Sequence, residues 1–191
     1  MQIPRSQLLI LGALAAAMAL TRLPMTASVL HLQDASWAVF FLAGFFLSAQ
    51  WRWAFPTLMA VAVAVDYTAI RYFGIPNYCV TVAYWFLVLS FAVLWLAGTW
   101  LHQRLTFDLR GALAAAASLV VSVSLCYLIS NGSFYWLGDR VEPSWNGWMA
   151  NLGHHYWSFL KASLIYVTAA VILYLVGMQL AGNAERVRSS G

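Results

Sequence analysis

Charged residues are scarce in this sequence. Asp, Glu, Lys and Arg together make up 8% of the 191 residues, hydrophobic residues make up 63%, and the mean hydropathy is +0.76. A water-soluble domain carries charge on about a quarter of its residues, so these side chains cannot cover a surface that faces water. The composition excludes a soluble globular protein and predicts an all-α integral membrane protein with a single domain over residues 1–191.

Several chemical signatures are missing as well. The ten Lys and Arg exceed the six Asp and Glu, but they form no basic run, so we expect no nucleic-acid partner. The sequence contains no HExxH, no phosphate-binding loop and no dinucleotide fingerprint, and its four histidines are not spaced three or four residues apart. We therefore expect neither nucleotide-driven work by this chain alone nor a histidine-based metal motif.

Six apolar segments are present, and each is a candidate transmembrane helix. They cover roughly residues 6–21, 35–50, 55–73, 77–101, 109–130 and 155–180. The stretch 131–153 is rich in Phe, Tyr and Trp among Gly, Asn and Pro. It is predicted to be a long outer loop, which either forms a lid or re-entrant turn or lies in the membrane interface.

The first segment resembles a signal peptide, because Arg5 precedes an apolar run that ends in small residues. We expect a retained helix instead, because the pairs Gly12/Ala16 and Ala13/Ala17 place small residues on one face. Such a face lets helices approach closely in lipid, either with a partner protein or within the same chain.

The arginines predict the orientation of the chain. With both termini in the cytoplasm, six arginines lie in cytoplasmic segments (Arg5, Arg52, Arg104, Arg110, Arg186 and Arg188) and three in outer loops (Arg22, Arg71 and Arg140). This distribution favours an N-in, C-in topology. The loops after the first, third and fifth helices then share the outer side.

The region from Asp66 to Tyr84 combines polar side chains with a helix break. Asp66 lies within an apolar run, where a carboxylate is costly unless it faces a cavity or a partner. A functional role in a cavity and a structural pair with Arg71 or a tyrosine hydroxyl are both compatible with this position. Gly74 is a natural left-handed terminator for the helix, and Pro76 cannot continue it.

Cys79, one of the two cysteines, follows this break. Asn77 is a good N-cap, which would place Cys79 in the first turn of the next helix. The helix dipole there favours the thiolate, so Cys79 is a candidate metal ligand or nucleophile. Cys126 lies in the middle of an apolar segment and is expected to be an inert buried thiol.

A chain of this length with six apolar segments and Ala-xxx-Ala spacing in the first resembles the S components of energy-coupling-factor (ECF) type ABC transporters for vitamins. Within these, Pro-Asn-Tyr-Cys at residues 76–79, with Asp66 before it and Tyr84 after it, looks like the BtuM family, the cobalamin-binding S components. The layout covers the whole chain, whereas the specific part of the resemblance is the stretch from Asp66 to Tyr84.

This resemblance implies a six-helix bundle in a bacterial cytoplasmic membrane, with a pocket for cobalamin (vitamin B12) on its outer face. It implies that Cys79 ligates the cobalt, a role that suits a soft thiolate. Thiolate ligation would also labilise an upper axial ligand such as cyanide, so cyanocobalamin decyanation is a secondary hypothesis. Further contacts to the vitamin are implied for five residues: Asp66, Tyr84, His31, Arg140 and Tyr135.

The same resemblance implies a protein partner. The alanine face of the first helix, with Ala13 and Ala17, would contact the membrane-embedded coupling subunit of an ECF energising module that contains two ATPases. The remaining surface would contact the lipid bilayer.

Two functions from other classes are also compatible with these residues. A membrane haem or metal redox protein would combine Cys79 with His31, His154 or His155. A membrane acyl-transfer enzyme would use Cys79 as nucleophile and a histidine as base. A structural scaffold, in contrast, would depend on neither Cys79 nor Asp66.

Overall fold

A computed structural model describes residues 4–24, 32–74, 82–106, 108–138 and 142–189 of the chain. Within these ranges the regular secondary structure is entirely helical. Among the described residues, four helical segments are long and apolar enough to cross a membrane, as expected for a multi-pass membrane protein. These segments are Ser48–Phe73, Val82–Arg104, Leu109–Leu137 and Trp145–Leu180.

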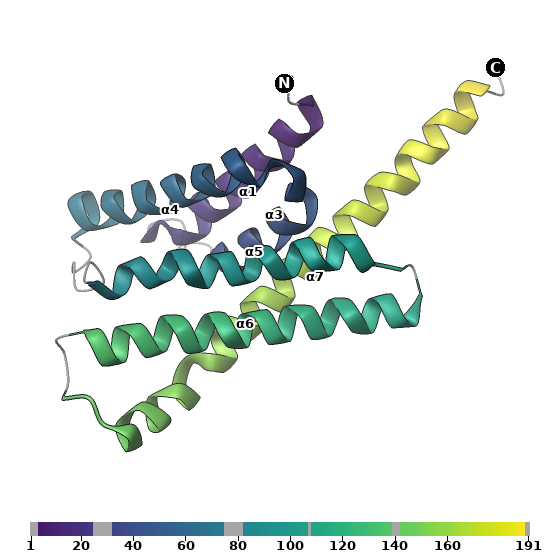
Figure 1. The fold of residues 1–191 in the computed structure, drawn as a ribbon. Coiled ribbons are helices and arrows are strands. Elements are labelled where there is room, and N and C mark those ends of the chain that lie inside the picture. Colours follow the sequence, from purple (N-terminus) through teal and green to yellow (C-terminus); the bar gives the residue numbers. More distant parts are fainter. Residues whose placement is uncertain (1–3, 25–31, 75–81, 107, 139–141, 190–191) are drawn as a thin grey trace.

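The helices run alternately in opposite directions along the molecule (Figure 1). In chain order they are α1 (Arg5–Arg22), α3 (Ser36–Phe46), the 3-10 turn η1 (Ser48–Gln50), α4 (Trp51–Phe73), the 3-10 turn η3 (Val82–Trp85), α5 (Phe86–Arg104), α6 (Leu109–Leu137) and α7 (Trp145–Ser189). The C-terminal ends of α1, α4 and α6 lie at one end of the molecule, which we name the polar end. The opposite end, where the helix termini carry Arg5, Arg52, Arg104 and Arg110, is named the arginine end.

The central element is α3, which packs against α1, α4, α5 and α7. All residues from Ser36 to Gly44 are buried, so this helix has neighbours on every side. Phe40 stacks on Phe91 of α5 with the ring centroids 4.2 Å apart. Trp37 stacks on Phe159 of α7 with the centroids 4.5 Å apart.

Two glycines bring the backbones of α3 and α5 into contact. A Cβ added to Gly44 would overlap the carbonyl group of Trp95. A Cβ added to Gly98 would likewise overlap the carbonyl oxygen of Phe41. The Thr99 hydroxyl of α5 donates a 3.1 Å hydrogen bond to the Gly44 carbonyl oxygen, so polar and steric contacts together fix this helix pair.

The single helix predicted over 35–50 is wrong, because the chain turns within this stretch. α3 ends at Phe46, and Leu47 adopts φ −120° and ψ 23°, outside the helical region. With 11 residues, α3 is about 17 Å long at ~1.5 Å per residue, and the hydrocarbon core is about 30 Å thick. α3 is therefore too short to cross a bilayer by itself, and the next helix starts at Trp51 rather than near residue 55.

The predicted outer loop over 131–153 is also wrong in most of its length. α6 continues to Leu137 and α7 begins at Trp145, so the connection covers only residues 138–144. Asn131 and Gly132 do not end α6, because a glycine inside a helix costs only about 1 kcal/mol. The Trp148 ring packs over Gly132, 3.7 Å from where a Cβ would lie. This close packing is possible because glycine has no side chain.

α7 starts ten residues before the predicted His155 because Ser144 provides an N-cap. The Ser144 hydroxyl accepts a 3.2 Å hydrogen bond from the Gly147 N–H, a standard way to satisfy the first amides of a helix. The aromatic side chains expected in a lid therefore belong to two helices.

Two local predictions are confirmed. Gly74 ends α4 in the left-handed conformation, with φ 65° and ψ 20°, and its N–H bonds to the Ala69 carbonyl oxygen. Cys126 is fully buried in α6. Pro76, Asn77 and Cys79 lie outside the described residues.

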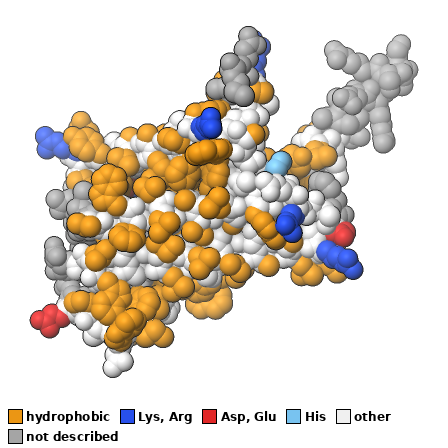
Figure 2. Space-filling model, viewed as in Figure 1, with side chains coloured by type: hydrophobic (Ala, Val, Ile, Leu, Met, Phe, Trp, Pro, Cys, Tyr) orange, Lys and Arg blue, Asp and Glu red, His pale blue; other side chains and the backbone are white. Residues whose placement is uncertain are grey.

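Hydrophobic side chains cover most of the face visible in Figure 2, and most charged side chains there lie towards the two ends of the molecule. Large hydrophobic residues are exposed along α4, α5, α6 and α7, for example Val63, Leu96, Val121 and Leu173. A soluble protein rarely exposes so extensive an apolar surface. The distribution fits a surface that faces lipid.

Candidate functional site

A cluster of charged and hydroxyl side chains lies at the polar end, where four segments of the chain meet. Arg22 is the last residue of α1, and Tyr84 belongs to η3. Asp66 lies two turns before the end of α4. Asp34 and Ser36 stand at the start of α3. These five residues form one hydrogen-bonded group, which we name the Arg22 cluster.

The strongest contact in the cluster joins α1 to α4. Arg22 Nε donates to Asp66 Oδ1 at 2.5 Å and Arg22 Nη2 donates to Asp66 Oδ2 at 2.7 Å. This parallel two-bond geometry is the preferred arrangement of a guanidinium and a carboxylate. It fixes the position of the Asp66 side chain between α1 and α4.

The same guanidinium also holds the start of α3. Arg22 Nη1 donates to Asp34 Oδ2 at 3.1 Å and to Ser36 Oγ at 2.9 Å. Asp34 Oδ1 in turn accepts hydrogen bonds from the Ser36 N–H at 2.8 Å and the Ser36 hydroxyl at 2.5 Å. The Arg22 side chain thus connects α1 both to the start of α3 and to α4.

Tyr84 completes the cluster from η3. Its hydroxyl donates a 2.8 Å hydrogen bond to Asp66 Oδ2. The cluster therefore contains two carboxylates, one guanidinium and neutral hydroxyl donors, which leaves one negative charge in excess. Carboxylate oxygens only accept hydrogen bonds when ionised, so the group is suited to a ligand that presents N–H donors.

The members of the cluster differ in exposure. The side chains of Arg22 and Asp66 are 16% and 22% exposed, whereas that of Asp34 is 35% exposed. A carboxylate about 10 Å from the end of an apolar helix is expensive without partners, and Asp66 has them. Asp34 is the carboxylate that a ligand would reach most easily.

The structure brings together two of the residues implicated from the sequence, Asp66 and Tyr84. Tyr135 lies apart from them, near the end of α6. Its hydroxyl accepts from the Ser144 N–H at 3.3 Å and donates to the Ser144 carbonyl oxygen at 3.2 Å. In this structure Tyr135 fastens the α6–α7 connection.

Cys79, His31 and Arg140 lie outside the described residues. For Cys79 and His31, however, members of the Arg22 cluster lie in the described chain on both sides of the segment that contains them. The segment 75–81, with Cys79, connects the helix that carries Asp66 to the turn that carries Tyr84. The segment 25–31, with His31, joins the end of α1 to the start of α3.

Ala13 and Ala17 are exposed on α1, together with Gly12 and Ala16. A Cβ added at Gly12 would meet no atom within 4 Å. Within the described residues this small-residue face is therefore not used for packing inside the chain.

Arg22 and Asp34 were not recognised as site residues from the sequence, where Arg22 counted only as an outer-loop charge. The alternative partner Arg71 is exposed and is not paired with Asp66. Helix geometry already argues against a pair between Asp66 and Arg71. The two residues are five positions apart, which corresponds to about 500° of rotation, so their side chains are separated by about 140° around the helix. Arg22 is 44 positions from Asp66, and no local pattern connects the two.

Three tryptophans face one another across the α6–α7 connection. The ring centroids of Trp136 and Trp145 are 4.9 Å apart, those of Trp136 and Trp148 are 6.2 Å apart, and those of Trp145 and Trp148 are 5.6 Å apart. The group lies at the polar end (Figure 1). Trp148 Nε1 and the Asn131 amide oxygen are buried without a hydrogen-bond partner among the described residues.

Among the described histidines, His102 lies against Phe45 with ring centroids 5.2 Å apart, and it belongs to the arginine end. His154 and His155 are neighbours on α7 with ring centroids 4.6 Å apart.

No family model matches the sequence, and no curated protein is significantly similar to it. The resemblance to the BtuM family thus depends on the Asp66–Tyr84 stretch and the overall layout.

Proposed function

We propose that this chain is a membrane-embedded binding subunit for cobalamin uptake. Cys79 would ligate the cobalt of the vitamin through its thiolate, and the polar end would provide the pocket. The vitamin is the cargo, and its cobalt is supplied with it. As the resemblance implies, an ECF energising module is the proposed partner in transport; the sequence itself contains no ATP-binding motif.

The observation that carries the proposal is the 2.8 Å hydrogen bond between Tyr84 and Asp66. These residues flank Cys79 in the sequence, with Asp66 before it and Tyr84 after it. Their contact brings together described residues that precede and follow the Cys79 segment, which supports a site at this charged group. A thiolate held in this way would meet its metal with less loss of conformational freedom.

The Arg22 cluster would contribute polar contacts in this proposal. Cobalamin carries amide groups around the corrin ring, and their N–H donors complement the excess carboxylate of the cluster. Asp34, as the more exposed carboxylate, would accept from such an amide, while Arg22 and Tyr84 hold Asp66 in place. One corrin face would be covered by the aromatic side chains of Tyr135, Trp136, Trp145 and Trp148. Further contacts to the vitamin are proposed for His31 and Arg140.

We place the chain in a bacterial inner membrane, with the polar end on the outer side and the arginine end on the cytoplasmic side. This orientation is supported by the arginines at the helix termini of the opposite end. The exposed face with Ala13 and Ala17 would then be available to the coupling subunit within the membrane.

The test is to purify the protein from cells supplied with cobalamin and to measure bound cobalt and the visible spectrum. We expect the wild type to retain cobalt with a corrin spectrum and Cys79→Ala to lose most of it. Cys126→Ala is the matched control, because this thiol is fully buried in α6 and should leave binding unchanged.

Other results would identify other functions. A wild-type protein without cobalt would refute the proposal. Bound iron with a haem spectrum would indicate the redox protein, and covalent labelling of Cys79 by an acyl donor would indicate the acyl-transfer enzyme. If Cys79→Ala retained cobalt with an unchanged spectrum, only the assignment of Cys79 as the cobalt ligand would be refuted, and cobalamin binding would stand.

The secondary activity has its own measurement. In the proposed exchange the cobalt–cyanide bond breaks as the cobalt–sulfur bond forms, and cyanide leaves with its electron pair. Incubation with cyanocobalamin should therefore shift the absorption spectrum and release free cyanide. An unchanged spectrum in a protein that binds the vitamin would rule out this step without affecting the binding function.

A further inference from the structure

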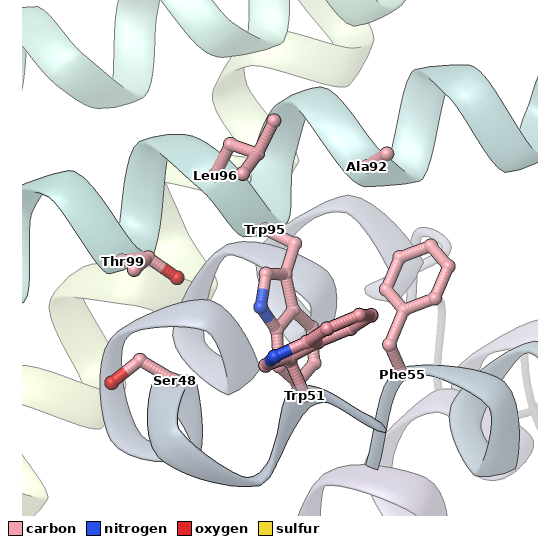
Figure 3. A pocket seen from close by; sticks show the side chains of 7 residues that line it. All are labelled: Ser48, Trp51, Phe55, Ala92, Trp95, Leu96 and Thr99. Atoms are coloured by element: carbon pink, nitrogen blue, oxygen red, sulfur yellow. The ribbon is translucent and has the colours of Figure 1, made fainter. Parts of the chain in front are cut away.

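Helix α5 borders two apolar hollows in the half of the molecule nearer the arginine end. The first lies between α5 and the η1–α4 corner, has a volume of about 390 Å³, and is shown in Figure 3. It is lined by Ser48, Trp51, Phe55, Ala92, Trp95, Leu96 and Thr99. Thr99 already donates to the Gly44 carbonyl oxygen, so the lining offers little polarity to a ligand.

The second hollow lies between α5 and α6 and also has a volume of about 390 Å³. Its lining includes small residues of α6, such as Ala114, Ala117 and Ser118, opposite Val93 and Trp100 of α5. Ser118 donates a 3.3 Å hydrogen bond to the Ala97 carbonyl oxygen, so this hydroxyl is also already bonded within the protein. Both hollows are therefore suited to hydrocarbon.

Each hollow begins beside a tryptophan that has an arginine over its ring. Arg52 Cζ is 5.9 Å from the Trp51 ring centroid at the first hollow. Arg104 Cζ is 5.7 Å from the Trp100 ring centroid at the second. Tryptophan and arginine are typical of the membrane interface, so each hollow has a cationic rim at headgroup level and an apolar interior.

The second hollow is about as long as one leaflet of a bilayer is deep, and the first is about two thirds of that length. Along α5 each hollow extends about 10 Å inward, from Thr99 to Ala92 and from Trp100 to Val93, at ~1.5 Å per residue. Along α6 the second reaches from Ala114 to Leu125, about 16 Å by the same measure. Half of a ~30 Å hydrocarbon core is about 15 Å, which is the length available to an acyl chain of one leaflet.

Charge decides which lipid fits. An acyl chain gains no hydrophobic free energy by moving from bilayer to protein, because lipid tails are as apolar as the hollow. Selectivity must therefore come from the headgroup, and a guanidinium binds a phosphate with two parallel hydrogen bonds. The described helix termini and connections of the arginine end carry Arg5, Arg52, Arg104 and Arg110 against Asp108, so an anionic lipid is favoured.

We propose that the two hollows are binding sites for anionic phospholipids, with one acyl chain in each hollow and the headgroup phosphate on Arg52 or Arg104. The sites are separate from the Arg22 cluster at the opposite end and do not depend on the proposed function of that cluster.

Native mass spectrometry of the intact protein in detergent would test this proposal. The protein is mixed with equal amounts of phosphatidylglycerol and phosphatidylcholine that carry identical acyl chains. We expect up to two bound phosphatidylglycerols, with a preference of about five-fold per site, because a surface arginine contributes about 1 kcal/mol to anionic lipid binding. Arg52→Gln should abolish the preference at one site, and the double variant with Arg104→Gln should abolish it at both.

Two further variants separate charge from shape. Arg71→Gln removes an exposed arginine at the opposite end of the molecule, away from the lining of both hollows, and should leave the preference unchanged. Ala92→Leu fills the first hollow and should remove one bound lipid while all four arginines remain. Equal binding of the two lipids, an equal effect of Arg71→Gln, or a change in oligomer mass instead of lipid number for Ala92→Leu would overturn the proposal.

Discussion

The two ends of the molecule use arginine in different ways. At the polar end, the Arg22 side chain is 16% exposed and donates hydrogen bonds to Asp34, Ser36 and Asp66. At the arginine end, Arg52 and Arg104 are exposed and lie over tryptophan rings. The first arrangement positions carboxylates within the protein, whereas the second leaves the cation free to meet groups from outside.

The difference shows that burial, more than residue type, decides what an arginine does. A buried guanidinium must have its charge neutralised locally because the cost of removing it from water is high. An exposed one retains its hydration, and its ring contact contributes only about 0.5–1 kcal/mol. Loss of Arg22 should therefore affect folding, and loss of Arg52 should not.

The largest expected effect is on stability when Arg22 is replaced. Arg22→Met leaves Asp66 and Asp34 without their cation, and we expect the free energy of unfolding to fall by about 3–5 kcal/mol. The measurement is reversible unfolding in mixed micelles. Arg52→Met is the matched control at the other end, with an expected change within about 0.5 kcal/mol.

The double variant Arg22→Met/Asp66→Leu sharpens this test. Removal of both charges avoids an unpaired buried carboxylate, so we expect it to be more stable than Arg22→Met alone. If Arg22→Met and Arg52→Met were equally destabilising, the contrast between the two ends would be wrong.

The next largest effect is expected where α3 and α5 touch. Gly98→Ala places a Cβ against the Phe41 carbonyl oxygen, and overpacking of this kind costs about 1–3 kcal/mol. Gly12→Ala on α1 is the control, because a Cβ there meets nothing within 4 Å and the helix gains about 0.5–1 kcal/mol. A stabilising Gly98→Ala would contradict the close approach of the two backbones.

A smaller effect is expected for the hydroxyl of the polar end. Tyr84→Phe removes the hydrogen bond to Asp66, which should lower the free energy of unfolding by about 1 kcal/mol because the arginine bonds remain. Tyr72→Phe, at an exposed position of the same end, should have no effect. Equal stability losses in the two variants would mean that the Tyr84–Asp66 contact does not stabilise the cluster.

The smallest effect concerns the exposed carboxylate of the arginine end. Hydrogen bonds from Thr106 and from the Gly111 N–H lower the pKa of Asp108 below its ordinary value of 3.8. A lowered native pKa means that the stabilisation is present above pH 3.8 and is lost as the pH falls through the native pKa. The stability difference between wild type and Asp108→Ala should therefore shrink below that pH.

Asp108→Asn is the control for this pH dependence. Asparagine also caps helices well but does not titrate, so its stability relative to Asp108→Ala should stay constant through the same range. An equal loss in both proteins would show that another group is responsible.

Local features of this fold were predictable from the sequence, and contacts between distant segments were not. Gly74 was identified as a helix end because a left-handed residue is a property of one position. The extent of α1 was close, with 6–21 expected and Arg5–Arg22 observed. The Arg22–Asp66 pair could not be derived, because apolar periodicity does not specify which helices become neighbours.

The errors at 35–50 and 131–153 have related physical causes. An apolar stretch can bend without changing composition, as it does at Leu47. Gly132 resembles a terminator, but its contact with Trp148 favours continued helix. In both places packing against another helix outweighed the local preference, and that information is not present in any short window of sequence.

The shortness of α3 has a consequence for biogenesis. A half-length helix preceded by Asp34 is too short to be released into the lipid by the translocation machinery as an autonomous segment. Arg22 finds its main counter-ion only after residue 66 has been synthesised. The first three helices must consequently enter the bilayer as one unit, with their charges matched during insertion. Nascent chains halted before α4 is complete should remain extractable by alkali, whereas chains that include it should not.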